Sequence, residues 1–363
     1  MSLNVDLIYE ILKRVDGMTL ANVGCASSVF KSVTTEEHIW EELCWSQWPS
    51  TRNEEVISLI SSLGGFRKFY ADCYPMIFTK EMVSAAEWSS VFPEEEEGWQ
   101  ECYDSDDGDL NAASASDFVS IVDVHYRNRA IYSKILWGIP GADDLHGWFF
   151  NCPFSINVVS DRAGGDGDLV NISSADGLPP IFSIESERKD GKLWGELSKN
   201  IRLSWILVNK RKKQAVNLAS WSPLGGQKHW PTDNDFLIRF GSILPAENIL
   251  PFRVVQCILV MKFRISLDGL EGRSYTLKLT ELGMQLEDIE GAHVNGRNSL
   301  LILKRAMSCC RTMNYANVSE SYHRYLKVRN ELQDEKTWNE GLIDTLCALG
   351  GISAFAICCF LVI

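Results

Sequence analysis

The sequence predicts an α+β fold with a three-helix module at the N-terminus, an antiparallel β-sandwich-like domain after it, and helices at the C-terminus. Three patterns indicate this class. Apolar residues recur at helical spacing in the first fifty residues, and apolar and polar residues alternate in short segments between Asp117 and Ile289. Residues 317–363 then return to a helical pattern.

The composition indicates a well-packed protein and argues against several functional classes. Hydrophobic residues make up 45% of the 363 residues, enough for a sizeable core. The formal net charge of −13 argues against nucleic-acid binding, which needs an excess of Lys and Arg. The 11 cysteines are scattered and form no C-x-x-C pair, so we expect neither a metal site nor disulfides. No charged leader precedes an apolar run, so no signal peptide is expected.

Residues 1–50 are predicted to form three short helices. The segment 5–14 places leucines and isoleucines on one helical face, and Asp16-Gly17 ends that helix. The segments 19–33 and 36–49 give a second and a third apolar face. Such a small unit cannot bury all its apolar surface by itself, so we expect part of that surface to bind a partner.

The same residues resemble the F-box motif, which usually holds a leucine–proline, an acidic–leucine pair, an E-I-L run, a leucine-rich middle and a final W-x-x-L-C. The matching stretches are Asp6-Leu7, Glu10-Ile11-Leu12, Leu20, Val23 and Trp40-Glu41-Glu42-Leu43-Cys44. The sequence departs from the motif at Asn4, where proline is common, and at Phe30, where tryptophan is common. Both departures are mild, because Asn can cap a helix and Phe remains aromatic.

The resemblance implies binding to the Skp subunit of an SCF ubiquitin ligase, and through it to a cullin. A few apolar anchors laid against a helical groove would supply most of the binding energy. The residues expected to contact Skp are Leu3, Leu7, Ile11, Leu12, Leu20, Val23 and Phe30. The residues expected to form the F-box core are Ile39, Trp40 and Leu43. The alternative is that the first set merely closes a small three-helix core.

The next two segments are predicted to connect this module to a second domain. Residues 51–85 continue the helical pattern and are expected to extend the module. Residues 86–115 are predicted to be an acidic linker, because the carboxylates from Glu94 to Asp109 repel one another. The alternative is a docking strip for a basic partner or a cation, although the spacing does not match a calcium loop.

Residues 116–310 are predicted to form a β-rich domain that recognises an as yet unknown protein substrate. We expect seven to nine strands without helices between them, and a hairpin turn at Arg127-Asn128-Arg129. The strand candidates are 117–126, 130–137, 147–160, 180–186, 201–208, 214–220, 235–244, 253–267 and 274–289. A short helix from Asn298 to Met307 follows.

Two features of this domain leave alternatives open. Lys210-Arg211-Lys212-Lys213 is expected to be a turn, with a nuclear-import signal as the alternative. The tryptophans at 194, 205, 221 and 230 are expected in the core, with a stacking surface for sugars or peptides as the alternative. A weak resemblance of SWILV…NLASWSP…FRVVQCILVMKFRIS to phloem-lectin sandwiches gives an alternative function, an F-box protein whose β domain binds carbohydrate.

No catalytic or nucleotide-binding signature occurs in the sequence. We therefore expect no enzyme activity and no cofactor. The order of the segments resembles that of plant F-box proteins, which implies a substrate-recognition adaptor of an SCF-type ubiquitin ligase.

The C-terminal residues predict attachment to a membrane. Residues 317–340 are predicted to be a juxtamembrane helix and residues 342–363 a transmembrane tail anchor. The uncharged residues 345–363 would span roughly 28 Å as a helix, close to the thickness of a bilayer's hydrocarbon core. We expect a single-pass membrane protein with cytosolic N-terminal domains. The alternative is a helix buried in a soluble cytoplasmic or nuclear protein.

Overall fold

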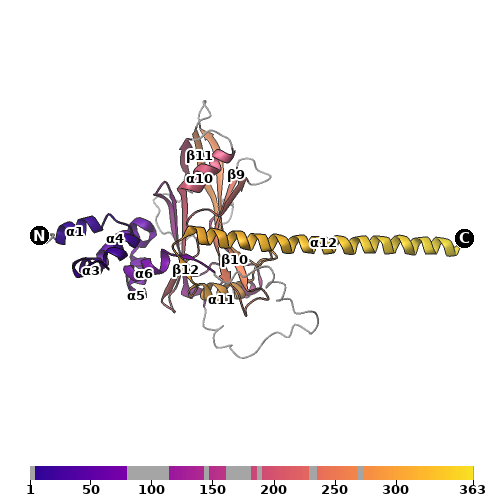
Figure 1. The fold of residues 1–363 in the computed structure, drawn as a ribbon, viewed down its shortest axis with the longest axis horizontal. Coiled ribbons are helices and arrows are strands. Elements are labelled where there is room, and N and C mark those ends of the chain that lie inside the picture. The colour runs from indigo at the N-terminus through magenta and orange to yellow at the C-terminus, as the bar shows by residue number, and fades with distance from the viewer. Residues whose placement is uncertain are drawn as a thin grey trace.

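The computed structural model describes residues 5–79, 114–142, 147–160, 181–185, 190–228, 235–268 and 274–362. Figure 1 shows three parts along the long axis: helices at the N-terminal end, a β-rich region in the middle, and one long helix that runs out to the C-terminus. The predicted α+β class is confirmed. The predicted acidic linker, 86–115, lies almost entirely outside the described residues.

The N-terminal helices form one unit, which we call the helical module. Its elements are α1 (Val5–Leu12), α2 (Gly17–Val23), α3 (Ser28–Thr34), α4 (Glu37–Gln47), η1 (Pro49–Arg52), α5 (Glu54–Leu63) and α6 (Phe66–Cys73). The segment predicted as a single second helix is divided into α2 and α3. The division lies at Ser27, whose hydroxyl accepts a hydrogen bond from the Phe30 N–H at 3.3 Å and so begins a new helix.

The first sheet has six strands in the order β12-β1-β7-β6-β2-β3. The strands are β1 (Met76–Ile77), β2 (Phe118–Tyr126), β3 (Arg129–Trp137), β6 (Ile201–Asn209), β7 (Gln214–Asn217) and β12 (Arg311–Thr312), with the short helix η3 (Ala115–Asp117) before β2. The pairs are antiparallel except for β1 with β7. The predicted β2–β3 hairpin is present, and both turn residues, Arg127 and Asn128, have positive φ angles of 49° and 61°.

The second sheet is formed by β4 (Ser155–Ser160), β5 (Ile181–Glu185), β8 (Gly225–Lys228), β9 (Asp235–Pro245), β10 (Val254–Asp268) and β11 (Ser274–Glu287). Its order is β4-β11-β10-β9-β8, and β5 also pairs with β11. The remaining helices are α9 (Trp148–Asn151), α10 (Asp190–Asn200), α11 (Gly296–Ala306) and α12 (Tyr315–Val362).

The expectation of strands without helices between them is wrong. Helix α9 occupies the first part of the predicted strand 147–160, and α10 lies between β5 and β6. In α10 the residues Trp194 and Leu197 are three positions apart and therefore share a helical face. Leu197 is fully buried in the core of the β-rich region, and Trp194 packs against that core. This contact explains why the segment is a helix.

The central strands of the first sheet are covered on both faces. In β2, Val122 and Val124 face the second sheet and belong to the core between the two sheets. Val119 and Ile121 point the other way and share a core with the helical module. The residues of β6 likewise alternate between the core shared with the second sheet and the core shared with the helical module. The molecule therefore has three layers, in the order helical module, first sheet and second sheet, and the module is packed directly on the sheet.

The first part of α12 is docked on the β-rich region. Tyr322 and Tyr325 are buried in a cluster with Ile243 of β9 and Val254 of β10. The Tyr325 hydroxyl donates a hydrogen bond to the Asp288 carbonyl at 3.0 Å. Beyond this base α12 extends away from the rest of the molecule (Figure 1). The segment predicted as a juxtamembrane helix thus begins as a packed part of the fold.

The predicted membrane localisation is corrected by the structure. No helix in the described part of the chain is both long enough and apolar enough to cross a bilayer. After Asp344, side chains are described only for residues 345–352. The side chains of residues 353–363, the rest of the predicted anchor, lie outside the described part.

Candidate functional site

Among the side chains that the structure describes on the first three helices, four large apolar ones are exposed, and we call them the apolar surface. Leu7 and Ile11 of α1 are each 53% exposed, Met18 of α2 is 47% exposed and Val29 of α3 is 48% exposed. Helix α3 contacts both α1 and α2, and these helices lie at the end of the molecule away from the β-rich region (Figure 1). Clustered exposed apolar residues are typical of a surface that binds another protein.

Buried neighbours and helix caps hold this surface in place. Ile8 and Leu12 lie on the opposite face of α1, and each is only 4% exposed. The Asp16 carboxylate caps α2 by accepting a hydrogen bond from the Thr19 N–H at 2.8 Å. That bond also lowers the pKa of Asp16 below its usual value. The presentation of Leu7 and Ile11 is therefore fixed by packing from beneath.

The residues predicted to form the core of the module lie on α4. Ile39 and Trp40 are buried, and Leu43 is partly buried against the same cluster. The Trp40 indole N–H donates to the Thr34 carbonyl at 2.8 Å, which ties α4 to the end of α3. The polar tip of this large side chain is thereby satisfied inside the core.

The residues predicted to contact Skp take up three kinds of position. Leu7 and Ile11 are exposed, Val23 and Phe30 are partly buried against the core, and Leu12 and Leu20 are buried. Leu3 lies outside the described residues. The role of these residues in binding stays a prediction, because burial alone does not test it.

Met18 and Val29 complete the apolar surface and were absent from the predicted set. Val29 lies in the apolar run of the segment 19–33, but helical spacing alone did not show which of its residues face outward. Met18 directly follows Gly17 at the start of α2. A helix boundary at Ser27, readable as an N-cap, would have indicated the correct face for Val29.

A charged pair lies next to α1. The Lys13 ammonium contacts the Glu42 carboxylate of α4 at 3.1 Å, and this hydrogen bond raises the pKa of Lys13. Lys13 also lies over the ring of Tyr9, 4.7 Å from its centroid. Polar groups beside an apolar patch are the usual composition of the rim of a protein interface.

The junction between the helical module and the first sheet carries buried polar contacts. The Trp48 indole N–H donates to the Ser204 hydroxyl of β6 at 3.1 Å. Asp123 of β2 accepts from the Ser50 backbone N–H at 3.2 Å, from the Ser50 hydroxyl, and from the Ser133 hydroxyl of β3 at 2.5 Å. Burial raises the pKa of Asp123 to about 6, although the hydrogen bonds from Ser133 and Ser50 act in the opposite direction.

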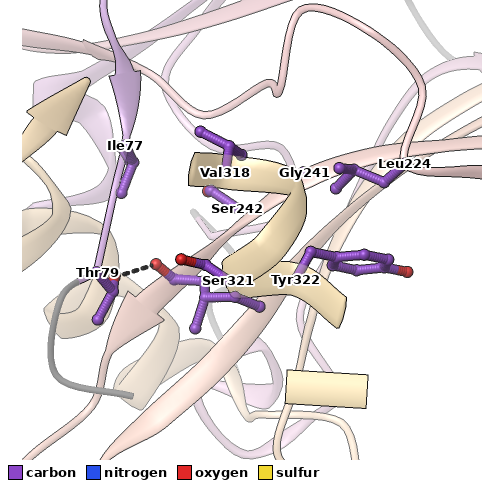
Figure 2. A pocket seen from close by; sticks show the side chains of 9 residues that line it. Ile77, Thr79, Leu224, Gly241, Ser242, Val318, Ser321 and Tyr322 are labelled. Atoms are coloured by element: carbon purple, nitrogen blue, oxygen red, sulfur yellow. Dashed lines mark hydrogen bonds between the residues drawn. The ribbon is translucent and has the colours of Figure 1, made fainter. Parts of the chain in front are cut away.

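A small cavity lies where α12 meets β9, and Figure 2 shows the side chains around it. Its volume is about 10 Å³, and Ile77, Ser242, Val318, Ser321 and Tyr322 contribute to its lining. Ligand pockets are usually of the order of 300–1,000 Å³, so this cavity is close to the size of one water molecule. Among the described residues, no group of three His, Cys, Asp or Glu side chains is placed to hold a metal ion.

Three of the four tryptophans considered for a stacking surface are described. Trp205 is fully buried, Trp194 packs near Phe236 with ring centroids 6.2 Å apart, and Trp221 contacts Tyr74 at 4.4 Å. Trp230 lies outside the described residues. The described rings thus contact protein, an arrangement that does not favour the carbohydrate-binding alternative.

Comparison with known proteins gives matches along nearly the whole chain. It is 29% identical to F-box protein At2g27310 of Arabidopsis thaliana over 366 residues, which cover 98% of this chain and 94% of the relative. It is 27% identical to probable F-box protein At2g36090 of the same plant, over 96% of this chain and 88% of the relative. The chain is thus similar to plant F-box proteins over nearly its whole length.

A shorter match involves a relative from another plant. F-box protein GID2 of Oryza sativa subsp. japonica is 32% identical over 71 residues, which cover 19% of this chain and 34% of the relative. No family model and no solved structure matches the chain. The likeness to F-box proteins therefore rests on similarity to Arabidopsis proteins over nearly the whole chain, together with the motif-like residues 6–44.

Proposed function

We propose that this F-box protein is a non-catalytic adaptor that recruits target proteins to an SCF-type ubiquitin ligase. The helical module binds the Skp subunit, which connects it to a cullin, and the β-rich region binds the protein to be ubiquitinated. The observation that carries the proposal is the apolar surface on α1, α2 and α3, at the free end of an F-box helical module.

The energetics of that surface support the assignment. Each of the four side chains leaves about half of its area in water, and covering it would gain about 1 kcal/mol per side chain. In this proposal Leu7, Ile11, Met18 and Val29 contact Skp directly. The other predicted contacts that the structure describes divide into two groups: Val23 and Phe30 are partly buried against the core, and Leu12 and Leu20 are buried within it. Leu3, outside the described residues, remains a proposed contact.

The test is a titration of the purified full-length chain with a Skp subunit, followed by calorimetry. The variant Leu7→Asp/Ile11→Asp should weaken binding by about 100-fold, because two charges would be placed in a desolvated apolar contact. Both positions are exposed, so the fold should persist and circular dichroism should be unchanged.

A matched control is available on α12. Leu342 and Ile343 are 51% and 58% exposed, similar to Leu7 and Ile11, but lie on the arm of the molecule that projects the other way. Leu342→Asp/Ile343→Asp should bind Skp as the unaltered chain does. Full affinity in the α1 variant, or equal loss in both variants, would refute the assignment of the surface.

The same proposal predicts that the target protein binds independently of Skp, through the β-rich region. Affinity purification of the full-length chain should recover ubiquitin-ligase subunits together with the target. The α1 variant should lose the ligase subunits and keep the target, since it alters only the helical module. Loss of both together would contradict the division of roles.

A further inference from the structure

The joint between the helical module and the first sheet is largely apolar. Val119 and Ile121 of β2 and Ile206 of β6 share one buried cluster with residues of the module such as Trp48 and Phe69. Apolar burial depends on the area removed from water and has little directional preference. The cluster explains why the module is attached, but it does not by itself define the angle of attachment.

The directional contacts at this joint fall into two places. Asp72 and Lys68 of α6 bond to Arg311 and to the Lys213 carbonyl, and a second pair of hydrogen bonds lies where β2 and β6 meet the module. Asp123 and Ser204 are direct partners in the β2–β6 register, so their side chains are on the same face of the sheet. Both bond to consecutive parts of the module: Ser204 accepts from Trp48, and Asp123 accepts from Ser50. Asp123 has no exposed area, and Ser50 has little.

We propose that Asp123 is a positioning residue that fixes the angle between the helical module and the β-rich region by accepting two hydrogen bonds from Ser50. If the module turned or slid on the sheet, the apolar contacts could re-form with new neighbours. The carboxylate would then keep only the Ser133 donor while still buried, and a buried charge that loses hydrogen bonds is strongly unfavourable. The orientation in which Ser50 bonds to Asp123 is therefore more stable than other orientations of the module that bury a similar apolar area.

The third donor to the carboxylate comes from within the sheet. The Ser133 hydroxyl of β3 donates to Oδ1 of Asp123, the oxygen that also accepts from the Ser50 N–H. Since Asp123 and Ser133 are direct partners in the β2–β3 register, Ser133 keeps Asp123 in place whether or not the module is aligned. The hydrogen bonds from Ser50 are then the ones that depend on the orientation of the module.

The consequence for ubiquitin transfer rests on the proposed function. If α1–α3 hold Skp and the β-rich region holds the target, this angle decides where the target's lysines lie relative to the ligase. Asp123 touches neither partner and would act only through the orientation of the module.

The experiment measures that angle in the full-length chain without Skp. Fluorophores are attached through unnatural amino acids at two exposed positions, Glu36 in the module and Glu247 after β9, so that the native cysteines stay unchanged. Single-molecule energy transfer then gives the distribution of distances between module and β-rich region. Melting temperature is recorded for each variant.

Asp123→Leu should widen the distance distribution about twofold while the melting temperature stays near that of the unaltered chain, because an apolar isostere commonly offsets the loss of a buried charge. Asp123→Asn keeps an acceptor oxygen for Ser50 and should retain the narrow distribution. Ser120→Ala is the control, because Ser120 also lies on β2 but accepts from Trp205 on the opposite face of the sheet.

A narrow distribution in folded Asp123→Leu would overturn the proposal, as would equal widening in the Ser120→Ala control. If Asp123→Leu fails to fold, Ser50→Ala/Ser204→Ala is measured instead, with the same criterion. Skp affinity is measured in parallel and should not change in any of these variants. Failure of Skp binding in the unaltered chain would count against the proposed function and leave the distance result interpretable.

Discussion

At the scale of a single residue, the burial of Asp123 makes the stability of the fold depend on pH. Its pKa is about 6 in the folded protein against a usual value of 3.8, because burial disfavours the charged form. The folded state therefore holds this proton more tightly than the unfolded chain. By linkage, the contribution of Asp123 to the free energy of unfolding falls as pH rises from about 4 to about 6, and is constant above that range.

Asp123→Asn should remove this decline, and urea denaturation between about pH 3 and 7.5 would measure it. Asp16→Asn is an informative control because the pKa of Asp16 is lowered in the folded state. The stability that Asp16 contributes is present above its unfolded pKa and is lost as pH falls. The two substitutions should therefore alter the pH profile in opposite directions, and parallel changes would contradict the assignment of Asp123.

Gly17 is a second residue whose role depends on close packing. A Cβ at this position would overlap the ring of Tyr70 in α6, and that ring is held between Trp40, Trp48 and Tyr74. Gly17→Ala should lower the free energy of unfolding by about 1–3 kcal/mol, since the ring has no room to move. Gly341→Ala, where no atom lies within 4 Å of the new Cβ, should cause no loss in the same denaturation assay.

At the scale of elements, sequence patterns predicted strands better than helices within the β-rich region. The turn residues Arg127-Asn128 and the alternation on either side were enough to predict the β2–β3 hairpin, because both signals are local. Helix α10 was missed because its one buried face, with Leu197, depends on the sheets beneath it. The split between α2 and α3 was missed at Ser27, where a serine cap competes with a continuous apolar pattern.

Helix α12 should lose its attachment if its base is altered. Tyr325 is fully buried and bonds to Asp288, and Arg329 one turn later contacts Glu287 at 3.3 Å. Tyr325→Ala should cost about 3–4 kcal/mol and speed hydrogen exchange in residues 315–329. Trp338→Ala, at a position 74% exposed on the same helix, should leave that exchange unchanged. Equal exchange in the two variants would show that α12 is held by other contacts.

At the scale of the whole molecule, the helical module and the β-rich region share one core. Because the first sheet is covered on both faces, neither part can lose the other without exposing apolar surface such as Val119, Ile121 and Val208. Calorimetry of the full-length chain should therefore show a single transition, with equal calorimetric and van't Hoff enthalpies.

Shortened chains test whether the helical module and the β-rich region depend on their shared core. A chain that begins at residue 76 should aggregate or bind a hydrophobic dye, because it bares one face of the first sheet. A chain that ends at Lys336 should keep the single transition, because residues 341–352 of α12, apart from the undescribed side chain of Asp344, are exposed. Independent melting of the two parts would mean that the shared core contributes little.

The sequence by itself determined the α+β class, the helical module with its F-box pattern, and most of the strands, because each of these is encoded in spacing over a few residues. Only the tertiary structure decided which leucines of the module are exposed, that the base of α12 is docked, and that Asp123 meets Ser50 across the joint. Those features depend on contacts between residues that are far apart in the chain, such as Ser50 and Asp123, which are separated by 73 positions. No local pattern specifies such contacts. Burial is a property of the assembled layers, and the roles of these residues follow from it.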